Sequence, residues 1–403
     1  MASTSGRSWS RLLSSDLIQA LHALRLSRPT QVQATAIPAA LEGNHVVLTA
    51  QTGSGKTLGY VLPLLELLRR DRAREARTTS PASPSPQALI VVPTRELAAQ
   101  VCRVWSDFTE CTGLTCSLLT RQAFQTSNEV AAWVSPARDT AGKGEPALWT
   151  RLRHLRYLVL DEADSLFAMQ QRNQLAPLPL HRLQGGQLWC VAATMTRGSL
   201  AQVEALARAL TPSRKLFIAR DNGLHEPPRI VRIRFELVQH PPQKVTRLLE
   251  WLQADARGLL RDGKSTLVFC NSIQTCRFVQ HTLREQGVLA LACHGGMPTR
   301  MRDAAVEQFA NGTADVLICS DLMARGIDWP FVGRVLSFDA PATYHHFLHR
   351  AGRLRRGGDC ITLIRRARRE QDLAMMIAKR FPERTHWQVM EQQPSLGRDR
   401  LRP

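Results

Sequence analysis

The sequence contains 403 residues, in which 53 lysines and arginines outnumber 34 acidic residues and leave a formal charge of +19. A chain of this length exceeds what one hydrophobic core usually supports, so we expect two domains. No apolar run approaches the ~20 residues that a membrane-spanning helix needs, so no membrane partner is expected. The positive charge favours a polyanionic partner, with nucleic acid as the first candidate.

The nine cysteines show no paired C-x-x-C spacing, which favours reduced structural thiols over a zinc site. The first fifteen residues carry Arg7, Arg11 and several serines but no acidic residue before Asp16, a composition similar to that of an organelle transit segment. This composition favours a mitochondrial location and leaves the nucleolus, the nucleus and the cytoplasm open.

The first half of the chain alternates apolar runs with polar loops. β-rich runs at 45–49, 89–92 and 157–160 each end in a phosphate-type or acidic loop, and a fourth run follows at 188–191. Functional loops at the ends of such strands are typical of a parallel sheet. The segment 69–87 is rich in Arg, Ser and Pro and is expected to be a surface loop.

A linker is expected at 221–229, where turn-forming residues and a double proline interrupt any helix or central strand. The alternation then restarts, with helices expected at 272–286 and 300–310 and strands at 266–269, 289–292, 316–319 and 334–337. We therefore predict a first domain at 1–220, the linker at 221–229, a second domain at 230–381 and a basic tail at 382–403.

Residues 50–57, with the sequence AQTGSGKT, follow a predicted strand and open a predicted amphipathic helix. In such a loop the backbone N–H groups wrap the phosphates of a nucleotide, and a lysine and a hydroxyl complete the site. Lys56 is predicted to offset phosphate charge and Thr57 to ligate Mg²⁺. The predicted nucleotide-binding residues of this loop are Gln51, Thr52, Gly53, Ser54, Gly55, Lys56 and Thr57.

Asp161-Glu162-Ala163-Asp164 lies at the end of the run 157–160, where an acid can reach metal held at the phosphate loop. Asp161 is predicted to hold Mg²⁺, and Glu162 to polarise the attacking water as a general base. A solvated acidic turn is the alternative for these four residues taken alone. Together with the phosphate loop, they indicate an NTPase.

With these two motifs the sequence resembles the DEAD-box RNA helicases, whose four-letter motif stands at 161–164. Further segments similar to family motifs occur in family order: PTRELA at 93–98, LVFCNS at 267–272, SDLMARGID at 320–328 and HRAGRLRR at 349–356. The resemblance spans nearly the whole chain and implies two tandem RecA-like α/β domains, each a mostly parallel sheet flanked by helices. It also implies ATP and Mg²⁺ as cofactors and RNA as the partner.

The resemblance assigns residues to nucleotide recognition. Gln33, in the sequence PTQVQ, stands where the family's adenine-reading glutamine lies. Trp9 is the candidate for the aromatic that stacks nearby, with a core tryptophan as the alternative. Asp328 matches the ribose-contacting acid. Arg353 and Arg356 match the arginine fingers that neutralise charge on the transferring phosphoryl group.

RNA contacts in this family go mostly to phosphates and 2′-hydroxyls, so they position a strand without reading its sequence. Arg138, in the sequence SPAR, matches a decayed Thr-Pro-Gly-Arg motif in which Ala137 replaces a glycine that permits close approach. The other positions that match RNA-contacting residues of the family are Pro93, Thr94, Arg95, Gly295, Gly296, Arg302, Ser320 and Arg325.

The sequence departs from the family at several motifs. Ala192-Ala193-Thr194 replaces Ser-Ala-Thr and so loses a hydroxyl that bonds the acidic motif. Residues 119–122 replace the family's glycine pair, Arg355 replaces a glycine between the finger arginines, and Thr299 stands where glutamine is usual. These departures affect residues expected to contact RNA or to couple ATP hydrolysis to domain closure. The phosphate loop, the acid pair and both finger arginines are intact.

We therefore expect an ATP-dependent RNA helicase, an RNA-dependent ATPase that clamps and remodels RNA or RNA–protein complexes. Ribosome assembly, with ribosomal RNA as the target, is the favoured setting, and a monomer with protein cofactors is expected. An ATP-binding RNA clamp or assembly scaffold with weak or no unwinding is the alternative, favoured by Ala192. A DNA helicase of related fold is a third hypothesis. The Gln33 segment and the sequence Asp-Glu-Ala-Asp at 161–164 both argue against it.

Overall fold

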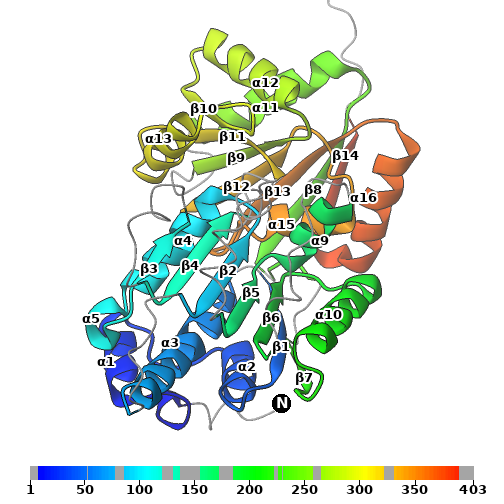
Figure 1. The fold of residues 1–403 in the computed structure, drawn as a ribbon. Helices are drawn as coiled ribbons and strands as arrows, with labels where there is room; N and C mark the ends of the chain where they lie inside the picture. The colour runs from blue at the N-terminus through cyan, green and yellow to red at the C-terminus, as the bar shows by residue number, and fades with distance from the viewer. Residues whose placement is uncertain are drawn as a thin grey trace, which may run out of the picture. The chain divides into compact units, whose positions relative to one another are not determined.

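The computed structural model describes residues 8–51, 53–77, 86–119, 130–136, 155–171, 185–221, 226–228, 230–256, 265–321 and 331–389. They divide into two compact units, the first ending at Glu226 and the second beginning at Pro227. Each unit is built on one seven-stranded sheet (Figure 1). Among the described residues, no helix combines the length and the apolar character that crossing a bilayer requires.

The first unit has the strand order β3-β4-β2-β5-β6-β1-β7, and every described pairing in it is parallel. The strands are β1 (His45–Thr49), β2 (Ala88–Val92), β3 (Cys116–Leu118), β4 (Ala132–Pro136), β5 (Tyr157–Leu160), β6 (Gln187–Ala192) and β7 (Leu216–Arg220). The helices are η1 (Trp9–Arg11), α1 (Ser15–Ala23), α2 (Gln31–Leu41), α3 (Lys56–Glu75), α4 (Arg95–Ser106), α5 (Thr109–Thr112), α9 (Ala163–Gln171) and α10 (Arg197–Leu210).

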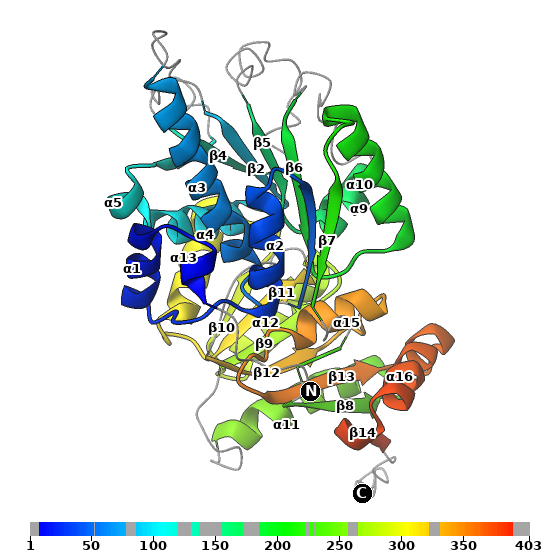
Figure 2. The same cartoon turned by 90° about the horizontal axis from the view of Figure 1, so that it is seen from below.

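Helices cover both faces of this sheet, which explains why its central strands are apolar throughout. Side chains that alternate along a strand enter two different cores: Val46 and Leu48 join a cluster with α2, α3 and α4, whereas Val47 joins a cluster with α9 and α10. Figure 2 shows α2, α3 and α4 on one side of the sheet and α9 and α10 on the other. Because the central strands are buried on both faces, polar residues lie in the loops that follow the carboxyl ends of these strands.

The second unit has the order β10-β11-β9-β12-β13-β8-β14, again with parallel pairings throughout its described strands. The strands are β8 (Val231–Leu237), β9 (Ser265–Cys270), β10 (Ala290–Cys293), β11 (Val316–Ser320), β12 (Val332–Ser337), β13 (Gly358–Ile364) and β14 (Thr385–Val389). The helices are α11 (Pro241–Ala256), α12 (Ile273–Glu285), α13 (Thr299–Ala310), α15 (Tyr344–Ala351), α16 (Arg368–Arg380) and η4 (Pro382–Arg384).

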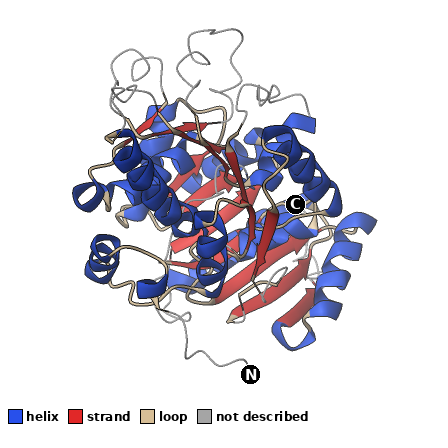
Figure 3. Cartoon of the chain, turned by 60° about the horizontal axis from the view of Figure 1, so that its bottom comes forward, coloured by secondary structure: helices blue, strands red, loops and turns tan. Residues whose placement is uncertain are grey.

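Alternation along β8 also assigns helices to the two faces of the second sheet. Phe235 meets Phe347 of α15, with ring centroids 6.4 Å apart. Its neighbour Glu236 points to the other face, where it accepts a hydrogen bond from Trp251 of α11 at 2.9 Å. Figure 3 shows each sheet, in red, flanked by blue helices. The expectation of two RecA-like α/β domains with parallel sheets is confirmed.

Two local expectations are wrong. Residues 69–75, predicted as part of a loop, continue α3, because no proline interrupts the chain before Pro81 and several of their charged side chains are paired. Asp71, for example, accepts a hydrogen bond from Tyr157 at 2.6 Å and pairs with Arg156 at 3.1 Å. The remainder of the predicted loop at 78–85 lies outside the described residues.

The second correction concerns the predicted tail at 382–403. Residues 382–389 form η4 and β14 instead, and β14 pairs with β8 along the edge of the second sheet. Trp387 packs against Phe235, with ring centroids 5.3 Å apart. This contact with the core explains why the chain continues into the sheet. Residues 390–403 lie outside the described residues.

Candidate nucleotide and RNA site

The predicted phosphate loop lies between β1 and α3, at the carboxyl end of the strand. Gly53 and Gly55 adopt φ values of 88° and 83°, a left-handed conformation that glycine takes without steric cost. A Cβ at Gly55 would lie 2.3 Å from Nε2 of Gln33, so a larger residue would displace the Gln33 amide and would also be strained by the left-handed backbone. Thr52, another predicted ligand, lies outside the described residues.

Two polar side chains of this loop, Lys56 and Ser54, lie close to its backbone. The Lys56 ammonium donates hydrogen bonds to the carbonyl oxygens of Ala50 at 2.8 Å and Gln51 at 2.9 Å. Ser54 Oγ is buried and has no hydrogen-bond partner among the described residues. A cation held over glycine-rich backbone, beside an unused buried hydroxyl, is the arrangement that a polyphosphate requires.

Gln33 closes the loop from the side of α2. Its Oε1 accepts a hydrogen bond from the Thr30 N–H at 2.8 Å, and Thr30 Oγ1 accepts one from the Gln33 N–H, which forms a capping box at the start of α2. Its Nε2 donates to the Gly55 carbonyl at 2.9 Å. The predicted adenine reader therefore joins the start of α2 to the phosphate loop.

The other residue predicted to meet the base, Trp9, is 2% exposed and belongs to the main hydrophobic cluster of the first unit. Its Nε1 donates a hydrogen bond to the carbonyl of Leu26 at 2.8 Å. A ring enclosed in this way offers little face for stacking. The packing supports the alternative interpretation of Trp9 as a core residue.

Asp161 and Glu162 follow β5 as predicted, and both are buried. Burial and the neighbouring charge of Glu162 raise the pKa of Asp161 to about 6, against the opposing effects of Tyr60, Lys56 and the Glu162 N–H. The Glu162 N–H donates to Asp161 Oδ1 at 2.8 Å, and the Tyr60 hydroxyl donates to Asp161 Oδ2 at 2.9 Å. Lys56 is thus close enough to lower the pKa of Asp161.

Glu162 has two unusual features. Its φ of 50° lies in the left-handed region, which a non-glycine residue adopts at a cost. Its Oε2 atom is buried without a hydrogen-bond partner among the described residues. Magnesium prefers hard oxygen ligands, and the buried carboxylates here, with the Thr57 hydroxyl at the start of α3, fit that preference. Of these carboxylate oxygens, Glu162 Oε2 can also accept a hydrogen bond from a water.

Asp164, the last acid of the motif, is hydrogen-bonded to the segment that follows β6. Thr194 Oγ1 donates a hydrogen bond to Asp164 Oδ2 at 2.9 Å, and the Ser165 N–H donates to Asp164 Oδ1 at the same distance. Ala192 is fully buried in an apolar cluster that also contains Ala163. One hydroxyl of the divergent Ala-Ala-Thr motif therefore bonds the acidic motif, although the first is lost.

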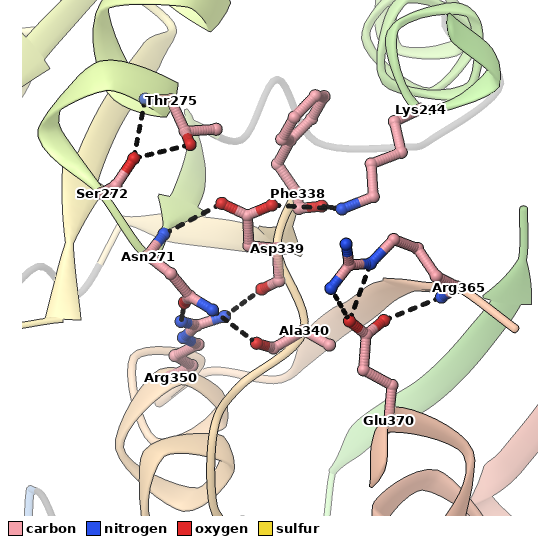
Figure 4. A network of polar contacts seen from close by, with 10 residues as sticks. All are labelled: Lys244, Asn271, Ser272, Thr275, Phe338, Asp339, Ala340, Arg350, Arg365 and Glu370. Atoms are coloured by element: carbon pink, nitrogen blue, oxygen red, sulfur yellow. Dashed lines mark hydrogen bonds and ion pairs between the residues drawn. The ribbon is translucent and has the colours of Figure 1, made fainter. Parts of the chain in front are cut away.

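In the second unit, a buried network centres on Arg350 of α15 (Figure 4). Its guanidinium, 1% exposed, donates to the Asp321 carboxylate at 2.6 and 2.8 Å, to the Asp339 carbonyl at 2.6 Å and to Asn271 Oδ1 at 2.7 Å. Lys244 of α11 donates to Asp339 Oδ1 at 3.1 Å. The network joins the ends of β9, β11 and β12 to α15, the helix that precedes the predicted arginine fingers.

The finger residues themselves differ in exposure. Arg353, just after α15, is buried and donates from Nε to the His349 carbonyl at 3.2 Å. Arg356 is exposed in the turn before β13. Asp328, the predicted ribose contact, lies outside the described residues. α15 is thus fixed by Arg350, while Arg356 remains accessible on the surface.

The predicted RNA-contacting residues follow the carboxyl ends of strands in each unit. Thr94 is buried and caps α4 by accepting a hydrogen bond from the Leu97 N–H at 3.2 Å, and Arg95 beside it is exposed. Arg302 of α13 donates to the Met297 carbonyl at 3.4 Å. Pro93 precedes α4, Gly295 and Gly296 follow β10, and Ser320 ends β11. Arg138 and Arg325 lie outside the described residues.

Comparison with known families agrees with this arrangement. Residues 30–203 match the family model described as DEAD/DEAH box helicase, and residues 243–358 match the helicase conserved C-terminal domain. The chain belongs to the DEAD-box helicase family. The matched ranges include Gln33, the phosphate loop, the acid pair and Arg353, whereas Trp9 lies outside them.

Curated relatives of this DEAD-box chain share about a third of its residues. A mouse probable ATP-dependent RNA helicase, DDX28, is 31% identical over 82% of the chain and 64% of the relative. DEAD-box ATP-dependent RNA helicase 39 of Arabidopsis thaliana is 32% identical over 86% of the chain and 56% of the relative. The chain therefore spans less than two thirds of the length of either relative.

Solved structures support the DEAD-box fold. Dbp5 of S. cerevisiae, bound to RNA and ADP BeF3, superposes with a TM-score of 0.73 at 22% identity and covers 96% of both chains. Mss116p bound to ssRNA and AMP-PNP gives a TM-score of 0.78 at 20% identity, over 97% of this chain and 81% of that one. At these identities the likeness concerns the fold alone.

The partners of several site residues were not foreseen in the sequence. Tyr60 and Thr194, which both bond acids of the DEAD motif, were not singled out for that role. The spacing of Tyr60, three residues after Thr57, was an available signal because such residues share one face of a helix. Lys244 gave no comparable signal, since its partner Asp339 lies far along the chain.

Proposed function

We propose that this DEAD-box chain is an RNA-stimulated ATPase that clamps RNA and remodels short duplexes or RNA–protein contacts. The observation that carries the proposal is the buried acid pair, Asp161 and Glu162, joined through Tyr60 to the helix that begins at the phosphate loop. Buried acids beside a lysine are costly to stability, so their presence favours a catalytic role.

In this proposal the backbone of the phosphate loop binds the β- and γ-phosphates and Lys56 offsets their charge. Thr57 and Asp161 would hold Mg²⁺, which would supply charge stabilisation for the phosphates. Glu162 accepts the proton of the attacking water. Its buried Oε2, which has no partner among the described residues, is the free acceptor that this step needs.

The proposal extends to the second unit by the family's pattern. Arg353 and Arg356 neutralise charge on the transferred phosphoryl group, and Asp328 contacts the ribose. The Arg350 network supports these roles because it fixes α15 through hydrogen bonds to charged groups. RNA is held by phosphate and 2′-hydroxyl contacts at the strand ends, so binding does not depend on sequence.

We further propose a ribosomal RNA target. A relative from Gibberella zeae, 29% identical over 85% of the chain, is described as an ATP-dependent rRNA helicase, RRP3. The charge of +19 favours so polyanionic a partner. The mitochondrion is proposed as the compartment on the composition of the first residues alone, and imaging of a C-terminal fluorescent fusion tests it. A fusion that stains nucleoli or the cytosol contradicts this location.

An ATP-binding RNA clamp with weak turnover is the second candidate, and Ala192 is the observation that favours it. The loss of a hydroxyl at this position removes one bond to the acidic motif. The bond from Thr194 to Asp164 acts against this candidate, because it still ties β6 to that motif.

Phosphate release from ATP, measured with RNA and with DNA of the same sequence, separates the candidates. The ATPase hypothesis predicts stimulation by RNA and little by DNA, with the Lys56→Ala variant inactive and deficient in nucleotide binding. ATP-dependent RNA retention without phosphate release would support the clamp. Equal stimulation by DNA contradicts RNA specificity, and unchanged ATP affinity in Lys56→Ala contradicts the phosphate-loop assignment.

A further inference from the structure

Tyr60 lies on α3, one turn after the phosphate loop, and joins that helix to the acidic motif. The residue is 1% exposed, and its hydroxyl donates to Asp161 Oδ2 at 2.9 Å across 101 positions of sequence. Tyr60 stands three residues after Thr57 and four after Lys56, so all three share one face of the helix. The residue predicted to ligate Mg²⁺ on α3 is therefore next to one that fixes the other predicted ligand.

The hydrogen bonds of Asp161 define the orientation of its carboxylate. Oδ1 accepts from the Glu162 N–H at 2.8 Å, and Oδ2 accepts from Tyr60. Two donors on different oxygens fix the plane of the group, and each oxygen keeps a further lone pair for water or metal. Without the Tyr60 hydroxyl, the bond from the Glu162 N–H is the one hydrogen bond to this carboxylate that remains among the described residues.

Packing alone does not account for a tyrosine at this position. A phenylalanine would fill the same space among apolar side chains, whereas a buried phenol needs a hydrogen-bond partner. The partner here is a carboxylate, which gives a stronger and more directional bond than a neutral acceptor. The hydroxyl therefore has a specific effect on Asp161 that the ring does not have.

We propose that Tyr60 is a positioning residue that holds the Asp161 carboxylate in the orientation required for magnesium-dependent nucleotide binding. The proposal rests on the function proposed above, in which Asp161 and Thr57 hold Mg²⁺. A hydroxyl that orients one ligand before the metal arrives reduces the conformational entropy lost on binding. Its removal should weaken binding of the magnesium complex and leave binding of the free nucleotide unchanged.

The chain offers a matched control. Tyr157, at the opposite end of β5, donates its hydroxyl to Asp71 Oδ2 at 2.6 Å, and both residues are buried. Asp71 also belongs to α3, so this second bond joins the same strand and the same helix away from the phosphate loop. Tyr157→Phe removes an equivalent hydroxyl and leaves Asp161 untouched. It reports the effect of a lost tyrosine–aspartate bond on stability alone.

The experiment uses the full chain and a fluorescent ADP analogue, titrated at a series of Mg²⁺ concentrations and in EDTA. For Tyr60→Phe we expect the Mg²⁺ concentration at half-maximal nucleotide binding to rise about tenfold, since a hydrogen bond to a charged group is lost. For Tyr157→Phe we expect no change. In EDTA the wild type and both variants should bind the nucleotide equally.

Equal Mg²⁺ dependence in wild type and Tyr60→Phe would overturn the inference, as would an equal shift in Tyr157→Phe. The Asp161→Asn background gives a second test, because there Tyr60→Phe should cause no additional shift if it acts through Asp161. An additional tenfold shift in that background contradicts positioning through Asp161. Binding that is independent of Mg²⁺ in the wild type would overturn the proposed function as well, which distinguishes the two failures.

Discussion

At the scale of single residues, Glu162 is the clearest case of a side chain whose structure is explained by function better than by stability. It is 3% exposed, its φ is 50° and its Oε2 has no partner among the described residues. Each of these features costs free energy, on the order of 1 to 3 kcal/mol for the backbone or for the unmade hydrogen bond. The general base proposed here must accept a proton from water and needs such a free oxygen.

Glu162→Gln is therefore expected to bind ATP with nearly wild-type affinity and to hydrolyse it at least about 100-fold more slowly, because an amide keeps the shape but cannot act as a base. Single-turnover phosphate release and nucleotide titration measure the two effects. The variant should also retain RNA longer in ATP. Glu66→Gln is the control, since Glu66 is likewise buried in the first unit but bonds the Ser14 N–H. Unchanged hydrolysis in Glu162→Gln contradicts its role.

At the scale of elements, the segment that follows β6 is joined to the start of α9 by the hydrogen bond from Thr194 to Asp164. Thr194 Oγ1 and the Ser165 N–H each donate a hydrogen bond to the Asp164 carboxylate. Ala192 presents only a methyl group, in the same apolar cluster as Ala163. A serine hydroxyl at this position could supply the family's missing bond.

We expect Ala192→Ser to raise RNA strand separation per ATP hydrolysed by up to about an order of magnitude, since one charge-assisted hydrogen bond contributes about 1.5 to 3 kcal/mol. Basal ATP affinity should stay nearly unchanged. Unwinding of a short RNA duplex is followed alongside phosphate release. Thr194→Ala is the opposite control and should lower the same ratio. An identical ratio in wild type and Ala192→Ser would show that the missing hydroxyl does not limit coupling.

In the second sheet, ion pairs and hydrogen bonds between charged side chains join the neighbouring strands β8 and β13. Asp359 of β13 accepts two hydrogen bonds from Arg232 of β8, at 2.9 and 2.8 Å, and one from Arg234 at 3.4 Å. Burial by itself raises the pKa of Asp359, but the hydrogen bonds and charges of Arg232 and Arg234 outweigh burial and hold the pKa below its usual value. A carboxylate with a lowered pKa stabilises the folded state above the unfolded pKa, and this stabilisation is lost as the pH falls through the folded pKa.

Asp359→Asn should therefore lower the free energy of unfolding at pH 7 by about 2 kcal/mol, a value that allows for the exposure of Arg232. Denaturant unfolding measures the loss, and the difference from wild type should shrink as the pH falls below about 4. Asp372→Asn is the control, because its pair with Arg368 at 3.9 Å is exposed on both sides. Equal losses in the two variants, or a loss that does not depend on pH, would falsify the account.

At the scale of the whole molecule, the formal charge of +19 favours the proposed RNA partner, and the number of phosphates that the protein neutralises sets how this binding should respond to salt. Each phosphate neutralised on a single strand contributes about −0.7 to the slope of log affinity against log salt. Arg302 of α13 is a proposed phosphate contact. Arg208 of α10 is equally basic but pairs with Glu204 on the exposed face of that helix.

Arg302→Ala is expected to weaken ATP-dependent RNA binding and to reduce the salt slope by about 0.7, because one phosphate contact is lost. Arg208→Ala should change neither quantity. Fluorescence anisotropy with a labelled single-stranded RNA, between 50 and 200 mM salt, measures both. If the two variants have the same slope, net charge rather than this contact governs binding. A weaker affinity with an unchanged slope would place Arg302 away from the phosphates.

The sequence by itself determined the features that depend on contiguous residues. The phosphate loop and Asp161–Asp164 were predictable because each works as a short segment at the end of an apolar strand. The parallel sheets followed from the same strands, whose residues are apolar on both faces. β3, β4, β7 and β13 were not predicted, and of these the edge strands β3 and β7 are not apolar throughout. β8 was also missed, although Val231–Leu237 alternates, because the nearby prolines suggested a linker.

Tertiary structure alone decided which distant groups meet. It brought Tyr60 to Asp161 and Thr194 to Asp164, and it joined Arg350 to Asn271 through a network that no local pattern describes. Such contacts depend on which strands are neighbours in the sheet and on which face each helix packs. Packing also assigned Trp9 to the core, because the cluster around it comes from helices and strands throughout the first unit. Local chemistry is encoded in segments, whereas the partners of a buried polar group are fixed only when the whole core has formed.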